Sequence, residues 1–140
     1  MSTDPRYPIG EFEKREVTPE LRQEHIATIA GLPAALKAAV AGLDDSQLDT
    51  EYRPDGWTVR QVVHHVPDSH ANALIRFKLA LTEDEPPTIK PYYEDRWAKL
   101  GDAQMPPDVS LRLIDAIHER WVGLLELPAE AAHVGVDETV

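Results

Sequence analysis

The fold is decided by the stretch GWTVRQVVHHVPDSH, which occupies residues 56–70 of the 140-residue chain. Thr58 can cap a helix, because its side-chain oxygen can accept hydrogen bonds from backbone N–H groups of the first turn. From Thr58 onward, apolar residues recur at helical spacing as far as Leu81, which predicts a long amphipathic helix near residues 58–82. Three histidines and an aspartate fall within seven residues of this helix. Histidine is the commonest protein ligand for transition metals, so the helix is also the first candidate for a functional site.

Two other segments show the same periodicity. Thr18-Pro19-Glu20 combines a capping hydroxyl, a proline in the first turn and an acidic residue, and it predicts the start of a helix near residues 19–42. Pro33 should kink or divide that helix. Residues from Asp108 to Ser110 are expected to cap a third long helix near residues 109–126. Shorter helical turns are expected at 44–48 and 92–100, with a proline-rich loop at 83–91.

These elements predict an all-α, up-down helical bundle, because no segment alternates as a half-buried strand would. We expect a single domain over residues 1–140, with residues 1–18 as an extended arm that contacts the helices through Tyr7, Ile9 and Phe12. A four-helix bundle needs one more long helix, and the tail from Ala129 is too short and polar to supply it. The open apolar face predicts self-association, with a homodimer as the expected form.

Composition excludes several classes of protein. The chain has 25 acidic and 14 basic residues, a net charge of −11, and no cluster of basic residues, so nucleic acid is not an expected partner. No apolar run approaches the roughly 20 residues of a membrane span. The N-terminus lacks the apolar region of a secretory signal, and there is no cysteine for disulfides or thiolate chemistry. We therefore expect a soluble cytoplasmic protein.

The histidines allow more than one interpretation. His64 and His65 are adjacent, so on a helix they point about 100° apart and cannot both face one metal. Each can pair with Asp68 on a shared helix face, either as a metal ligand with its carboxylate partner or as a solvated surface pair. His70 lies near the middle of the apolar stripe, so periodicity alone favours His70 as the inward-facing residue, either as a ligand or as a core histidine bonded to a carbonyl. His25 and His118 have mainly polar neighbours and are expected at the surface, and His133 lies in the tail.

Four segments resemble sequences of the DinB/YfiT family of metal-dependent hydrolases. They are YPIGEFEKRE at 7–16, SQLDTEYRPDGWTVRQVVHH at 46–65, DSHANALIRFKLALTE at 68–83 and IKPYYEDRWAKL at 89–100. The resemblance implies a four-helix bundle and a divalent metal, zinc or nickel, that three histidines hold together with water. Carried over to this sequence, the first metal ligand is His65, in preference to the His70 that periodicity favours.

In that family the other two ligands form an H-x-x-x-H pair on a fourth helix, and this sequence contains no such pair. Pro67 also stands where the family has a small helix-forming residue. The resemblance implies a hydrolase of small-molecule substrates in which the metal activates water, with Asp68 nominated as a nearby catalytic carboxylate by its spacing from His65. The alternatives are transfer of a low-molecular-weight thiol to an electrophile, and a shortened or degenerate, non-catalytic helical module that serves dimerisation.

Overall fold

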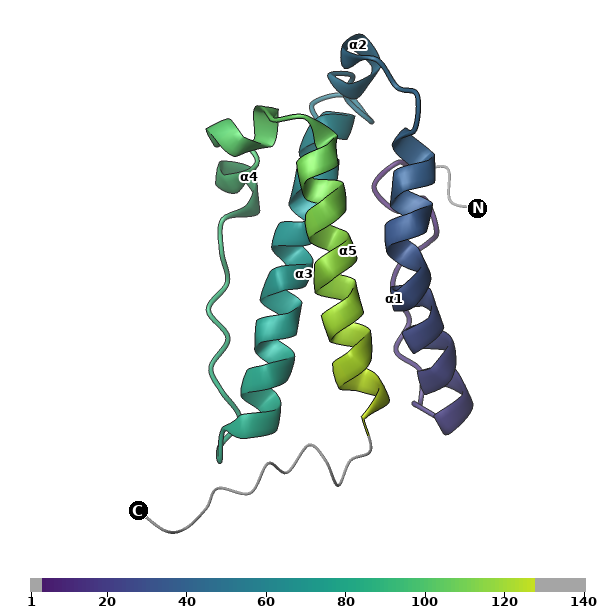
Figure 1. Cartoon of the computed structure of the whole chain (residues 1–140), viewed down its shortest axis with the longest axis vertical. Helices are drawn as coiled ribbons and strands as arrows, with labels where there is room; N and C mark the ends of the chain where they lie inside the picture. Colours follow the sequence, from purple (N-terminus) through teal and green to yellow (C-terminus); the bar gives the residue numbers. More distant parts are fainter. Residues whose placement is uncertain (1–3, 128–140) are drawn as a thin grey trace.

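The computed structural model describes residues 4–127, and these residues form an all-α fold (Figure 1). The elements in chain order are α1 (Pro19–Val40), α2 (Asp45–Leu48), α3 (Val59–Thr82), α4 (Glu94–Trp97), the 3-10 helix η1 (Gly101–Gln104) and α5 (Pro107–Glu126). The prediction of three long helices is confirmed, with boundaries within two residues of those expected. The tail from Ala129 and His133 lie outside the described residues.

Local sequence explains where the long helices begin. Thr18 Oγ1 accepts a hydrogen bond from the backbone N–H of Leu21, at 3.1 Å, and Pro19 opens α1. Thr58 and Gln61 form a reciprocal capping box at the start of α3. The expected cap of the third helix was wrong: α5 begins at Pro107, ahead of Asp108, and has no side-chain cap. Proline is favoured there because its fixed φ suits the first helical turn and its missing N–H would have no helical partner.

The two internal prolines do not divide their helices. Pro33 lies inside α1 and Pro67 inside α3, and each helix continues past its proline. The prediction that Pro33 could divide the first helix was therefore wrong. Proline deprives the carbonyl four residues earlier of its helical partner. For Pro33 that carbonyl belongs to Ile29, and His118 Nδ1 of α5 lies 2.5 Å from its oxygen.

Helix α5 packs against both α3 and α1, whereas α1 and α3 have few contacts with each other (Figure 1). The main apolar cluster joins Leu74 of α3 to Ile117 and Trp121 of α5, with Ile29 of α1 packed against it. Six residues of α5 are buried, but α1 buries only Ile26 and Pro33. The long helices are thus held together mainly through α5.

The N-terminal arm differs from its prediction. Ile9 and Phe12 are 96% and 92% exposed, and Tyr7 is 41% exposed. The expected apolar contacts of Ile9 and Phe12 with the helices were therefore wrong. Across residues 4–127, no helix is both long enough and apolar enough to span a membrane.

Candidate functional site

The loop before α3 fixes the position of Trp57. The backbone N–H of Tyr52 donates to the carbonyl of Trp57 at 3.1 Å, which closes the loop as a short hairpin. Gly56 is required within this hairpin, because an added Cβ would lie 2.7 Å from Cγ of Arg53. Trp57 Nε1 donates to Asp95 Oδ1 of α4 at 3.0 Å. The indole ring is therefore held from both its backbone and its side chain.

Arg60 anchors the first turn of α3. Its side chain is buried, and its charge is paired with two carboxylates. Nε donates to Asp49 Oδ1 at 2.8 Å, and Nη2 donates to Asp45 Oδ1 at 2.9 Å. Nη1 donates to the carbonyl of Met105 at 3.3 Å. One guanidinium group thus connects α3 to the α2 segment and to Met105, two residues before α5.

His64 has a structural role. Its Nε2 lies 2.7 Å from the carbonyl oxygen of Met105, and its Nδ1 lies 2.6 Å from Ser110 Oγ. A carbonyl can only accept, so Nε2 carries the proton and, in the neutral ring, Nδ1 accepts from the Ser110 hydroxyl. His64 is buried and both of its nitrogens are occupied. It is not available as a metal ligand.

His65 points in a different direction, as the helical spacing predicted. Its half-buried ring lies against the ring of Trp57, with centroids 4.7 Å apart and an interplanar angle of 66°. Within residues 4–127, neither ring nitrogen of His65 makes a hydrogen bond. The other large polar side chains of the 56–65 stretch are all engaged, namely Trp57, Thr58, Arg60, Gln61 and His64.

Asp68 is half-buried one turn further along α3. Burial raises the pKa of its carboxyl group, the negative charge of Asp102 raises it further, and His65 and His64 partly oppose the increase. His65 is therefore close enough to influence Asp68 electrostatically. No hydrogen bond or ion pair joins these two side chains in the part of the chain that the structure describes.

His70 and His118 form a pair that periodicity anticipated only in part. His70 Nδ1 lies 2.6 Å from His118 Nε2, and the rings stack with centroids 4.8 Å apart. The expected carbonyl partner of His70 was therefore wrong. So was the surface position expected for His118, which is 2% exposed. The spacing of His118 indicates a buried position, because it lies four residues after Ile114 and three before Trp121, on the same helix face. His25 is exposed, as predicted.

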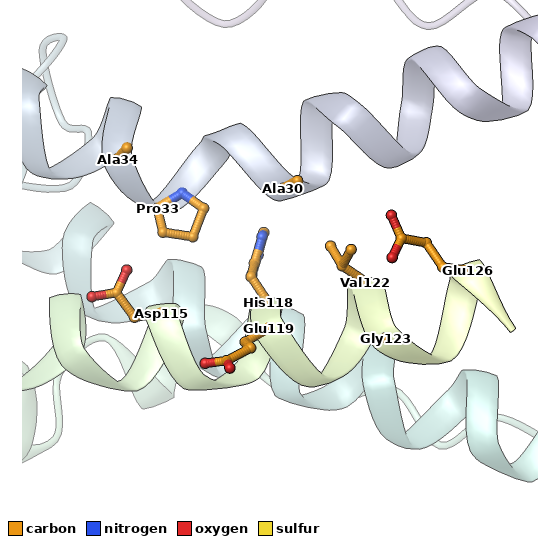
Figure 2. A pocket seen from close by; sticks show the side chains of 9 residues that line it. All are labelled: Ala30, Pro33, Ala34, Asp115, His118, Glu119, Val122, Gly123 and Glu126. Atoms are coloured by element: carbon orange, nitrogen blue, oxygen red, sulfur yellow. The ribbon is translucent and has the colours of Figure 1, made fainter.

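A groove of about 580 Å³ runs between α1 and α5 beside His118 (Figure 2). Its α1 side is formed by small residues, including Ala30 and Ala34, and its α5 side carries Asp115 and Glu119. Figure 2 shows the ring of His118 pointing from α5 toward α1, next to Pro33.

The described residues do not form a complete metal site. Across residues 4–127, no three histidine, aspartate or glutamate side chains are grouped so that they could hold a metal ion. His65 offers one imidazole ligand, and a single imidazole cannot fix a divalent ion in an open tetrahedral site, which uses three protein ligands. The side chains of residues 4–127 therefore do not by themselves fit a metal site with three protein ligands.

Comparison with known proteins supports this reading of the fold. Residues 28–137 match the DinB superfamily. A protein of Bacillus cereus (strain B4264) and one of Bacillus anthracis (strain CDC 684), each named "Putative metal-dependent hydrolase", are both 58% identical to this chain over 123 residues. In both cases the match covers 87% of this chain and 70% of the relative.

A solved structure gives a similar result. YfiT from Bacillus subtilis, described as "a probable metal-dependent hydrolase with an unusual four-helix bundle topology", matches with a TM-score of 0.86 and 48% identity. The match covers 91% of this chain and 74% of YfiT. The three long helices described here therefore follow the fold of that bundle.

Proposed function

We propose that this chain, which belongs to the DinB superfamily, acts in metal-dependent hydrolysis of a small molecule and uses His65 as a metal ligand. The names of the relatives support metal dependence and hydrolysis. A bound divalent ion, with zinc or nickel as the candidates, would supply Lewis acidity and lower the pKa of water so that a nucleophile forms at neutral pH.

One observation favours His65 over the other histidines of α3. Its neighbours in the 56–65 stretch use their polar groups to cap α3 or to join it to other segments, whereas both ring nitrogens of His65 have no hydrogen-bond partner among residues 4–127. Trp57 packs against the ring and restricts its orientation. Surrounding residues commonly fix the orientation of a metal-binding side chain.

Asp68 is proposed as a carboxylate that acts beside the metal ligand. Its pKa is raised mainly by burial, which is the usual condition of carboxyl groups that exchange protons near neutral pH. The missing ligands would come from a fourth helix that carries H-x-x-x-H or from a partner chain. A low affinity of the unsupplemented 140-residue chain for zinc is part of this proposal.

Zinc and nickel titrations of three proteins test the proposal. The 140-residue chain should bind either metal weakly, and a fusion that appends a family-type helix with H-x-x-x-H should bind tightly. His65→Ala in the fusion should abolish tight binding, whereas the matched variant His25→Ala, at an exposed position of α1, should not change it. Tight binding by the unmodified chain that survives His65→Ala would place the metal elsewhere.

Activity assays then separate the chemical alternatives. The metal-loaded fusion should hydrolyse activated esters or amides in a reaction that depends on His65. If it consumes a low-molecular-weight thiol together with an electrophile and does not hydrolyse, the thiol-transfer reaction replaces hydrolysis. If it binds metal and does neither, the chain serves as a non-catalytic helical module.

A further inference from the structure

A chain of hydrogen bonds begins where Pro33 interrupts the bonding pattern of α1. Pro33 has no N–H, so the Ile29 carbonyl loses its usual helical donor. His118 of α5 takes that place with Nδ1, and Figure 2 shows its ring beside Pro33. Because a carbonyl has no proton to donate, Nδ1 of His118 must be the protonated nitrogen.

The position of the proton on His118 determines which ring nitrogen of His70 carries a proton. In the neutral ring of His118, a proton on Nδ1 leaves Nε2 with a lone pair. That lone pair faces His70 Nδ1 at 2.6 Å, so Nδ1 of His70 must be the donor. The remaining nitrogen of His70, Nε2, then carries an unshared electron pair.

The surroundings hold His70 in this state. The ring of Trp121 packs edge-on at 5.6 Å from the ring of His70 and also at 5.6 Å from that of His118. Within residues 4–127, Nε2 of His70 makes no hydrogen bond, and it is not among the polar atoms that are fully buried without a partner. Nε2 of His70 is therefore not fully buried, and its lone pair has no partner among residues 4–127.

Electrostatics favour the neutral ring of His70 at physiological pH. Burial lowers the pKa of His70 below its ordinary value of 6.5, and interactions with His118 and His65 lower it further. The titratable groups that act on His70 are thus His118 of α5 and His65 of its own helix, while α1 contributes the carbonyl of Ile29 through His118. No carboxylate of residues 4–127 is among the groups that shift the pKa of His70.

We propose that His70 is a proton acceptor, with Nε2 as the basic atom and His118 as the residue that positions its proton. This inference rests on the proposed function and adds a group that metal ligation does not use. The nearest alternative is a core histidine that serves packing alone. Such a residue would not need an accessible nitrogen held free of a proton.

The proposed step is a balanced proton transfer. The O–H bond of the attacking water, or the S–H bond of a small thiol, breaks as its proton moves to Nε2 of His70. The electron pair stays on oxygen or sulfur and forms the new bond to the electrophilic carbon, and the bond between that carbon and the leaving group breaks with its electron pair going to the leaving group. The imidazolium of His70 then returns the proton to the leaving group and is neutral again.

Long-range ¹H–¹⁵N NMR of the histidine rings tests the proton positions without metal or substrate. At pH 7, His118 and His70 should both carry their proton on Nδ1, whereas His64, which donates from Nε2 to Met105, should show the opposite tautomer in the same spectrum. His118→Phe removes the acceptor and should return His70 to the Nε2–H tautomer that free imidazole prefers. If that variant does not fold, Pro33→Ala restores a helical donor to Ile29 and should shift both rings toward Nε2–H. A proton on Nε2 of His70 in the unmodified chain overturns the proposal.

Kinetics test the catalytic part with p-nitrophenyl acetate as the probe and the zinc-loaded fusion protein as the enzyme. His70→Gln should lower kcat/KM by about 10² or more, the usual contribution of a general base. It should also remove the acidic limb of the pH profile, whose midpoint should match the pKa of His70 from NMR. Hydrolysis that is unchanged in His70→Gln overturns the role of His70 and leaves the proposed function intact. Absence of hydrolysis in every form of the chain overturns both, whatever the NMR shows.

Discussion

The ring of His65 lies edge-on against the ring of Trp57, with centroids 4.7 Å apart, and Trp57 is itself tied to Asp95 through its indole nitrogen. The orientation of the candidate ligand therefore depends on a loop and on α4, both outside the helix that carries it. A ligand whose rotamer is restricted before it binds loses less conformational entropy when it binds.

Trp57→Leu should weaken metal binding without unfolding the helices. Loss of the ring that packs on His65 should lower zinc affinity about 10- to 100-fold in the fusion protein, as loss of orienting neighbours does at other metal sites. Asp95→Asn is the matched control, because an amide oxygen still accepts from the indole N–H. Competition against a chelating dye measures the affinity, and equal affinity in Trp57→Leu would show that the packing does not orient His65.

Arg60 should be far more sensitive to substitution than its exposed partner. Arg60→Lys cannot reproduce three divergent contacts from one planar group and should destabilise the fold by about 1–3 kcal/mol. Asp45 is 90% exposed, so Asp45→Ala should cost less than about 1 kcal/mol. Urea unfolding of the two variants makes the comparison, and an equal cost would mean that the buried contacts of Arg60 add little.

Asp68→Asn should stabilise the protein at neutral pH. Because burial raises the pKa of Asp68 above 3.8, the folded state binds its proton more tightly than the unfolded state does. Ionisation of Asp68 therefore costs folding free energy, and this cost grows as pH rises from 3.8 through the raised pKa. Unfolding free energies should be higher for Asp68→Asn at pH 7, and the gap should narrow toward pH 4. A variant less stable at pH 7 would contradict the prediction.

The open side of α3 should drive self-association. Phe77 and Leu81 are 40% and 41% exposed and lie four residues apart, so they share one helix face. Leu81→Lys should shift a dimer toward monomer in sedimentation experiments. Ile75→Lys is the control, because Ile75 is exposed but points about 200° away from Phe77. A monodisperse monomer of the unmodified chain at high concentration would refute this prediction.

Sequence patterns located the long helices because caps and apolar spacing are local properties. Thr18 and Thr58 cap the helices that follow them, as their positions indicated. Tertiary contacts could not be found in the same way. The position of His118 depends on a carbonyl 89 residues earlier, and that carbonyl is available only because Pro33 cannot donate to it.

The candidate site was predictable in the same uneven way. The adjacent histidines were expected to diverge, and they do, but only the structure shows that His64 is occupied by Met105 and Ser110 while His65 is not. Ile9 and Phe12 show the opposite kind of error. Their apolar side chains were expected to pack against the helices, but both are exposed.

Because α1 is held almost entirely by α5, it should open as a cooperative unit before α3 separates from α5. Its amide hydrogens should exchange with solvent sooner than those of α3. Each such opening removes the Ile29 carbonyl from His118 and frees that ring to change tautomer. The packing of α1 on α5 and the position of the proton on His118 are therefore thermodynamically linked. A ligand that binds the lone pair on Nε2 of His70 would also slow the opening of α1, although it does not contact α1.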